Sequence, residues 1–299
     1  MSGTRMDAST GAAVAFTLVF WASAFAGIKE GLVGYAPGQL ALVRFGTASL
    51  VLAIYAVVTR MRLPRLTDLS RLGVAGFLGI TIYHVSLNFG ELTVSAGAAS
   101  LLIAAAPVFT ALLAAAFLGE RLTTWGWFGI GVAFSGVAAI AVGESGGGLA
   151  FEPGALLILL AAVSTSAYFV VSKPLLKRYR PLEFTAYAIW AGTVPMLVFA
   201  PGLVEQAATA PLSATMAGIY IGVFPGALAY VSWSRVLSRL PASAVSTFLY
   251  IAPVLAIIIA WVWIGEVPAI TSLAGGAVAI AGVAIVQTKG VRRAQVPAQ

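Results

Sequence analysis

The stretch PVFTALLAAAFLGE at residues 107–120 has a second copy, PVLAIIIAWVWIGE, at residues 253–266. Each copy begins with a proline, continues as an apolar run and closes with Gly-Glu. The shift that superimposes the two copies also superimposes three more pairs: Ser100 on Ser246, Gly129 on Gly275 and Gly136 on Gly282. A nearly identical shift places Phe25 on Phe169, Lys29 on Lys173, Tyr35 on Tyr179 and Pro37 on Pro181. The chain is therefore predicted to be a duplication of a unit of about half its length.

The composition predicts an integral membrane protein. The 299 residues are 60% hydrophobic and only 9% charged, with a mean hydropathy of +0.99, whereas soluble domains carry roughly 25% charged residues. The absence of cysteine excludes disulfides, thiolate metal sites and cysteine nucleophiles. The isoelectric point near 9.9 would suggest nucleic acid in a soluble protein. Because the basic residues lie between apolar runs, we attribute it to membrane orientation and expect no nucleic-acid partner.

Ten apolar runs have about the 20 residues that a bilayer crossing needs. We predict spans at residues 12–31, 39–59, 69–89, 95–118, 124–143, 153–172, 182–200, 214–234, 243–264 and 269–288. The expected organisation is two five-helix repeats with a linker and two tails: 1–11, 12–143, 144–152, 153–289 and 290–299. A cleaved signal peptide at residues 1–26 is the alternative for the first span, but the repeat includes this helix.

The basic residues predict the orientation. Of the 17 Lys and Arg residues, Arg44 lies inside a span and Lys29 lies on one side; all the others belong to loops on the other side or to the tails. Such asymmetry predicts cytoplasmic N- and C-termini and a periplasmic linker in a bacterial-type inner membrane. Because each half has an odd number of helices, the second half must enter the membrane upside down. The predicted fold class is all-α integral membrane, with two inverted repeats around a central cavity.

Polar and aromatic side chains within the spans are the candidate cavity residues. In the first span, Trp21, Phe25 and Lys29 share one helix face, and Ser23 lies beside them. Lys29 would either face the cavity or extend its charge to the membrane surface. Arg44 is about 10 Å along its helix from Pro37. It would either bind a carboxylate, as a charge ligand, or pair with Glu30, Glu91 or carbonyl groups.

The third span is the most polar. It contains Tyr83, His84, the one histidine of the chain, and Asn88. His84 is either a cavity residue or a packed core residue. The second half contributes four aromatic candidates, Tyr168, Tyr230, Trp233 and Tyr250. We expect them to face the centre, or alternatively to pack between helices. The repeated pair Pro107 and Pro253 would act as hinges, or merely as architectural kinks. Nothing in the sequence indicates a catalytic residue, a metal site or a cofactor.

These residues resemble the drug/metabolite transporter superfamily, specifically its ten-helix, two-repeat EamA-type carriers, over residues 12–288. The matching features are Phe20-Trp21-Ala-Ser23-Ala-Phe25 with Lys29, the pair Arg44-Phe45 after Pro37, and the repeated Pro…Gly-Glu run. The Tyr83-His84 pair is similar to the aromatic amino-acid exporter branch. The resemblance implies secondary transport of small metabolites, often export. A lysine and an arginine recur at the positions of Lys29 and Arg44 across the family, which favours a structural role for both.

The predicted function is a secondary transporter that works by alternating access and exports small metabolites, amino acids including aromatic ones. The alternatives are a membrane-embedded enzyme and a passive channel. We do not expect an enzyme, because no span holds paired carboxylates. The same absence predicts facilitative movement, with His84 and Glu91 remaining as alternative proton relays. The expected partners are a small-molecule substrate and the lipid bilayer, and a monomer would suffice.

Overall fold

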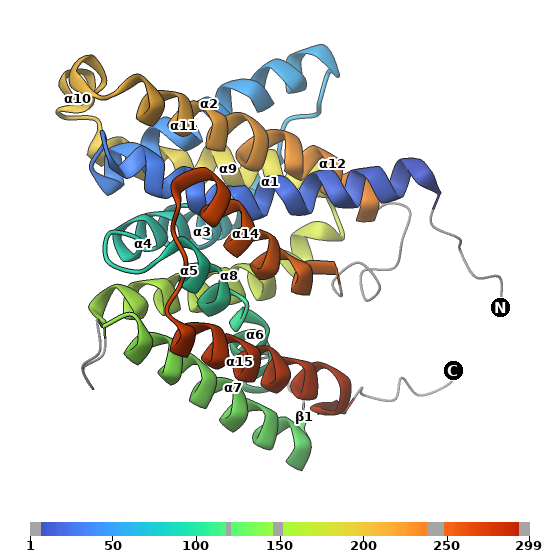
Figure 1. The fold of residues 1–299 in the computed structure, drawn as a ribbon. Helices are drawn as coiled ribbons and strands as arrows, with labels where there is room; N and C mark the ends of the chain where they lie inside the picture. Colours follow the sequence, from blue (N-terminus) through green and yellow to red (C-terminus); the bar gives the residue numbers. More distant parts are fainter. Residues whose placement is uncertain (1–6, 118–120, 146–151, 238–247, 293–299) are drawn as a thin grey trace, which may run out of the picture.

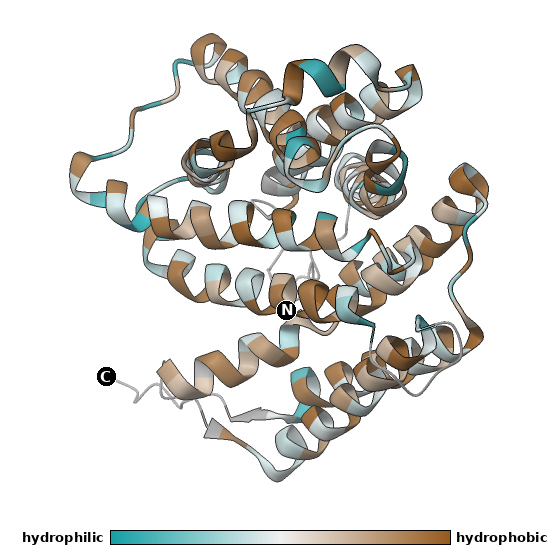
Figure 2. Ribbon diagram, turned by 90° about the vertical axis from the view of Figure 1, so that its left-hand side faces the viewer, coloured by the Kyte–Doolittle hydropathy of each residue, from teal (hydrophilic) through white to brown (hydrophobic). Residues whose placement is uncertain are grey.

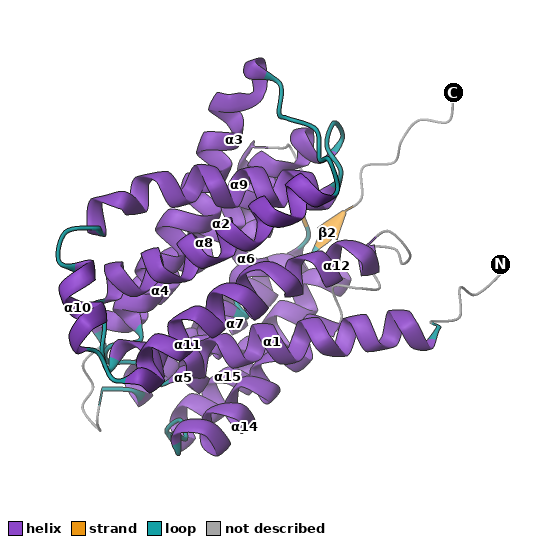
Figure 3. Cartoon of the chain, turned by 90° about the horizontal axis from the view of Figure 1, so that it is seen from above, coloured by secondary structure: helices purple, strands orange, loops and turns teal. Residues whose placement is uncertain are grey.

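The computed structural model describes residues 7–117, 121–145, 152–237 and 248–292, and this part of the chain is almost entirely helical (Figures 1 and 3). Its first half contains α1 (Ala8–Leu32), α2 (Pro37–Val58), η1 (Leu66–Asp68), α3 (Leu69–Gly76), η2 (Phe77–Ile82), α4 (Tyr83–Gly90), α5 (Ala96–Ile103), α6 (Ala106–Phe117), β1 (Arg121–Leu122) and α7 (Thr124–Gly143). The second half contains α8 (Pro153–Leu176), α9 (Pro181–Met196), η3 (Leu197–Phe199), α10 (Leu203–Thr209), α11 (Leu212–Val223), η4 (Phe224–Leu228), α12 (Ala229–Leu237), η5 (Leu249–Ile251), α14 (Ala252–Ile264), α15 (Ile270–Lys289) and β2 (Val291–Arg292).

Nine helices of the described residues are long and apolar enough to cross a membrane. They correspond to nine of the ten predicted spans. The predicted span 243–264 is described only in part, where Leu249–Ile264 forms a shorter apolar helix, so the count of ten stays a prediction. Two small elements were not predicted. One is α10, which follows Gly202 in a left-handed conformation at φ 77°, and the other is the antiparallel pair of β1 with β2.

Two kinds of helix interruption recur in both halves. Helices α6 and α14 each begin one residue before a proline of the repeated run, Pro107 or Pro253. Proline is tolerated in a first helical turn because the amide hydrogens there have no partner within the helix. The third span of the first half and the corresponding helix of the second half both contain a π-helical segment, η2 and η4. Such segments are rare and are found mostly at functional sites.

Helices α7 and α15 lie antiparallel and in contact, with small residues between them. A Cβ atom added at Gly136 would collide with the backbone of Gly275 and Ala279, and one added at Gly282 would collide with the backbone of Gly129 and Ala133. The two sets of contacts exchange under the repeat, because Gly136 and Gly282 are matched positions and so are Gly129 and Gly275. Small residues allow such close approach of helices in a membrane.

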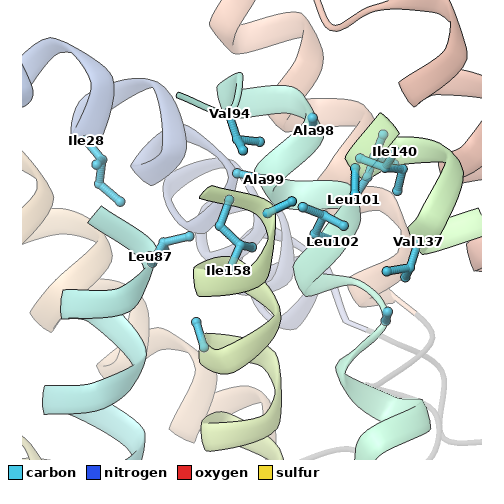
Figure 4. Packing of buried hydrophobic residues seen from close by; sticks show 14 of the residues in the cluster. Ile28, Leu87, Val94, Ala98, Ala99, Leu101, Leu102, Val137, Ile140 and Ile158 are labelled. Carbon is cyan, nitrogen blue, oxygen red and sulfur yellow. The ribbon is translucent and has the colours of Figure 1, made fainter. Parts of the chain in front are cut away.

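The largest buried cluster surrounds α5. Figure 4 shows Leu101 and Leu102 of α5 among Ile28 of α1, Ile140 of α7 and Ile158 of α8. Apolar residues also occupy the outer surfaces of the helices, where Figure 2 shows hydrophobic colour along their length. Several large apolar side chains there are more than half exposed, including Leu50, Trp125, Trp127, Val194 and Trp261. Because lipid would cover this surface, it agrees with the membrane prediction.

Candidate functional site

Four buried residues hold all the unpartnered polar side-chain atoms in the buried, described part of the chain. These atoms are Nε and Nη1 of Arg44, both ring nitrogens of His84, Oδ1 of Asn88 and both carboxylate oxygens of Glu91. The four residues are between 0% and 4% exposed. Buried polar groups in proteins nearly always have a partner, and each exception needs an explanation. These four residues are therefore the candidate site for a polar ligand.

Helices α2 and α4 position these groups. His84 and Asn88 are one helical turn apart on α4, and Glu91 directly follows that helix. The Asn88 Nδ2 atom donates to the carbonyl oxygen of Pro37, at 3.0 Å, and fixes the end of α4 against the start of α2. The His84 ring lies 4.3 Å from that of Phe45, between centroids. Arg44 lies 5.2 Å from the same ring centroid.

The charges of this cluster act on one another although no ion pair joins them. The positive charge of Arg44 is within electrostatic reach of Tyr230, Tyr83 and Glu91. Burial raises the pKa of the Glu91 carboxyl well above its ordinary range, and Lys29 opposes this rise. Among the described residues, neither Arg44 nor Glu91 has an oppositely charged partner within 4.0 Å. The predicted structural pairing of Arg44 with Glu30 or Glu91 is therefore not present as a direct contact.

Aromatic side chains from both halves adjoin the cluster. Trp21 of α1 packs against Tyr230 and Trp233 of α12, with ring centroids 5.3 and 5.1 Å apart. Tyr83 meets the edge of the neighbouring His84 ring at 4.4 Å. Tyr168 of α8 stacks on Phe184 and is within electrostatic reach of Tyr230. These predicted cavity residues are therefore brought toward one region.

Three predicted cavity residues have other surroundings. The Ser23 hydroxyl is hydrogen-bonded to that of Tyr220, at 2.7 Å. Phe25 packs against apolar clusters that include Ile28. The Tyr250 hydroxyl donates to the side chain of Gln287, and its ring packs with residues of α6, α7 and α15. These contacts pack the three side chains against neighbouring helices, and their place in the cavity stays a prediction.

A network of carboxylates ties together the helices at the end of the bundle opposite the start of α1 (Figure 1). Lys29 forms an ion pair with Glu266, at 3.4 Å. Glu266 also accepts the backbone amide hydrogen of Ala96, at 2.9 Å, and Glu144 accepts that of Ser95, at 2.8 Å. Two carboxylates thus neutralise the N-terminus of α5. No group of three His, Asp or Glu residues that could hold a metal ion occurs in the described residues.

Comparison with known proteins gives the family. The profile of the EamA-like transporter family matches residues 9–142 and again residues 152–288. This chain belongs to the EamA-like transporter family. Its membership places it among transporters and not among enzymes, and within the drug/metabolite transporter superfamily.

Relatives of this EamA-like transporter are named as a transporter, an exporter or an efflux pump. It is 46% identical over 283 residues to the "Probable terminal-alkyne amino-acid exporter" of Streptantibioticus cattleyicolor, covering 94% of this chain and 95% of that protein. It is 45% identical over 270 residues to the "Uncharacterized transporter YdfC" of Bacillus subtilis, covering 90% and 88%. The "Probable amino-acid metabolite efflux pump" of Salmonella typhimurium is 27% identical over 292 residues, covering 94% and 95%. A solved crystal structure shares the fold, with a TM-score of 0.60, 21% identity and coverage of 94% and 96%.

Some residues of the site were missing from the sequence-based candidates. Phe45 was noted only as part of a motif, and Glu91 only as a possible relay or partner. Tyr220 and the carboxylate pair Glu144 and Glu266 were not proposed for any contact. The signal for Glu266 was present, because it ends the second copy of the repeated run and Lys29 was assigned to the same side of the membrane.

Proposed function

We propose that this transporter exports amino acids, including aromatic ones, by alternating access. The observation behind the proposal is the set of unpartnered groups, cationic Arg44 and acidic Glu91 together with His84 and Asn88. An amino-acid zwitterion offers a carboxylate and an ammonium group, and so matches a site with the cation of Arg44 and a carboxyl group, Glu91, that could ionise when the ammonium group binds. The names of two relatives, an amino-acid exporter and an amino-acid metabolite efflux pump, support the same substrate class.

In this proposal Arg44 binds the substrate carboxylate. A guanidinium group donates two parallel hydrogen bonds to a carboxylate, which fixes orientation as well as charge. Arg44 Nε and Nη1 have no partner among the described residues, so either atom could donate one hydrogen bond to the carboxylate. Glu91 and the Asn88 Oδ1 atom are acceptors and would hold the ammonium group. A buried arginine costs at least about 3 kcal/mol inside a membrane unless it is paired. Binding of the substrate carboxylate would pair Arg44 and reduce this cost.

The substrate side chain would lie against Tyr83, Phe45, Tyr230 and Trp21. Aromatic faces provide broad apolar contact with few geometric demands, and they attract cations. We therefore expect several neutral or cationic amino acids to compete for the site. A phosphorylated sugar would bring two negative charges against Glu91 and should be rejected.

Alternating access would follow from inverted repeats. Three observations support this arrangement: the antiparallel contact of α7 with α15, the exchange of their glycine contacts under the repeat, and the matched breaks before Pro107 and Pro253. Transporters with inverted repeats open to each side in turn by moving one bundle against the other around a fixed site. The Lys29–Glu266 ion pair would hold one end closed, and the two proline breaks would be the hinges.

Glu91 favours proton relay over simple facilitation. It directly follows a span and burial raises the pKa of its carboxyl, so it retains a proton at a pH where an exposed carboxyl has lost it. An arriving ammonium group would stabilise the charged carboxylate and release that proton. The substrate ammonium group and the proton would then compete for the carboxylate of Glu91, and such competition is what a transporter needs to exchange substrate for a proton.

Counterflow in proteoliposomes tests the function. Vesicles loaded with unlabelled phenylalanine should accumulate radiolabelled phenylalanine, and tyrosine, tryptophan and other neutral amino acids should compete. A channel would equilibrate the label without accumulation, and an enzyme would convert it to another compound. Orientation is tested separately by the variant Ala298→Cys, since the chain has no native cysteine. Labelling of this cysteine by a membrane-impermeant reagent in intact cells would contradict cytoplasmic termini.

A further inference from the structure

A basic pocket lies at one end of the bundle, away from the substrate site. It has a volume of about 400 Å³ and is lined by five arginines, Arg60, Arg62, Arg65, Arg178 and Arg180, with one carboxylate, Glu183. The arginines come from two connections that are distant in the sequence, one between α2 and η1 and the other between α8 and α9. The proposed transport mechanism does not use this pocket.

The pocket is built and held in place. Asp68 is 1% exposed; it accepts a hydrogen bond from Arg178 Nη1 at 2.7 Å and another from the Tyr179 hydroxyl at 2.9 Å. The Tyr179 hydroxyl in turn accepts the amide hydrogen of Arg65, at 3.0 Å. Asp68 therefore neutralises Arg178 and fastens one connection to the other.

The arginines of the connection between α2 and η1 have no carboxylate that neutralises them among the described residues. Arg60, Arg62 and Arg65 are exposed and form no ion pair within 4.0 Å among the described residues. Arg60 has a left-handed backbone at φ 51° because it ends α2: the amide hydrogens of Arg60 and Met61 are accepted by the carbonyl oxygens of Val57 and Ala56, which is a common C-terminal helix cap. This cap fixes the position of Arg60 at the pocket. The N-terminus of the 16-residue helix α9 starts at the same pocket and adds positive potential.

The location of the pocket indicates what kind of anionic ligand it would bind. The pocket lies where four candidate spans end or begin: Pro37–Val58, Leu66–Gly90, Pro153–Ser172 and Pro181–Phe199. Beside the arginines, the large apolar side chains of Val57, Val58, Leu63 and Leu66 are between 76% and 87% exposed. A ligand that fits both features has a phosphate at the membrane surface and acyl chains below it. Basic pockets between spans at the cytoplasmic surface bind such head groups.

We propose that this pocket binds the phosphodiester head group of an anionic phospholipid, with Arg60, Arg62 and Arg65 as its ligands. The acyl chains would cover the exposed apolar residues beside it. Arginine forms paired, charge-assisted hydrogen bonds with phosphate oxygens. This proposal does not depend on the substrate proposal, because the pocket shares no residue with the substrate site.

The test is native mass spectrometry of the purified full chain in a neutral detergent, titrated with phosphatidylglycerol or with phosphatidylcholine of the same acyl chains. We expect the parent to bind phosphatidylglycerol more tightly. The triple variant Arg60→Gln, Arg62→Gln, Arg65→Gln should lose about fivefold in affinity for each charge removed. A control of equal net charge changes three exposed basic residues outside the pocket, Arg71→Gln, Lys177→Gln and Lys289→Gln, and should bind as the parent does.

Three outcomes would overturn the proposal: equal binding of the two lipids by the parent, equal losses in the pocket and control variants, or displacement of the lipid by glycerol 1-phosphate at the same concentration. The last outcome would assign the pocket to a soluble phosphate compound. Unfolding temperatures without lipid check that each variant is folded. If the triple variant fails to fold, the single variant Arg62→Gln with its expected fivefold loss takes its place.

Discussion

Helices α2 and α4 of the first half bring Arg44 and His84 into the buried centre, whereas the matched positions of the second half are Ala188 in α9 and Tyr230 in α12. The helix breaks, the π-helical segments and the glycine contacts, by contrast, occur in both halves. The difference separates two roles. The features that both halves share build the helical frame of the bundle. The features that only the first half has, Arg44 and His84, are the groups that we propose bind the substrate.

The largest effect is expected at Arg44. The variant Arg44→Gln removes the charge that would bind the substrate carboxylate, and loss of one partner of a buried charge pair costs about 2–5 kcal/mol. Uptake in proteoliposomes should fall by roughly 30-fold or more. The comparison variant in the second half is Tyr230→Phe, because the position that matches Arg44 is Ala188 and carries no polar group; this variant removes one hydroxyl and should retain most of the activity. Equal losses in the two variants would remove the distinction between the halves.

The shared frame predicts equal sensitivity at matched glycines. The variants Gly136→Ala and Gly282→Ala each place a methyl group against the backbone of the facing helix, and overpacking of this kind costs about 1–3 kcal/mol. Both should lower the unfolding temperature in detergent by similar amounts. Gly131→Ala is the control, because a Cβ there would have nothing within 4 Å. Strong destabilisation by only one of the matched pair would argue against a two-fold frame.

The next comparison is between His84 and its neighbour Tyr83. Both ring nitrogens of His84 are unpartnered, and a hydrogen bond to a ligand is worth about 0.5–1.5 kcal/mol. His84→Ala and Tyr83→Ala should both reduce transport, by roughly threefold to tenfold, while the protein stays folded and inserted. Full uptake of every substrate by purified His84→Ala would remove His84 from the site.

The smallest effect concerns pH and stability. Burial raises the pKa of Glu91, so the folded protein binds this proton more tightly than the unfolded chain. The stabilisation of the folded protein by this bound proton is complete below the ordinary carboxyl pKa of about 4.5. It is lost as the pH rises toward the raised pKa of Glu91. The unfolding temperature of the parent should therefore decrease between about pH 5 and pH 7, relative to that of Glu91→Gln. Parallel curves for the two proteins would mean that Glu91 is not held protonated.

The frame was largely predictable from the sequence because it depends on patterns that repeat. Apolar length located nine spans. Pro107 and Pro253 were expected inside spans as hinges or kinks, and in the structure a new helix begins one residue before each of them. The π-helical segments were not predicted, since a one-residue change in hydrogen-bond register leaves no mark in hydropathy. The site was predicted in part. His84, Asn88 and Arg44 were found because a polar group within a span is costly.

Some contacts of the candidate residues could not be predicted from one helix. Ser23 and Tyr250 were predicted for the cavity from residue type and helix alone, and in the structure their hydroxyls bond to Tyr220 and Gln287. Glu91 was underestimated because it lies just outside a predicted span, and its complete burial depends on how α4 packs. The surroundings of these residues depend on contacts between residues that are distant in the sequence, and the periodicity along one helix does not predict such contacts.

Binding of an amino-acid carboxylate by Arg44 can be measured with one set of titrations. Phenylalanine, phenethylamine, which lacks the carboxylate, and 3-phenylpropanoate, which lacks the ammonium group, are titrated into the parent and into Arg44→Gln. We expect the parent to bind phenylalanine more tightly than phenethylamine by at least tenfold, and Arg44→Gln to bind the two alike. This role of Arg44 is contradicted if phenylalanine, tyrosine and tryptophan do not bind the parent while a phosphorylated sugar does, or if Arg44→Gln keeps the full preference for phenylalanine over phenethylamine.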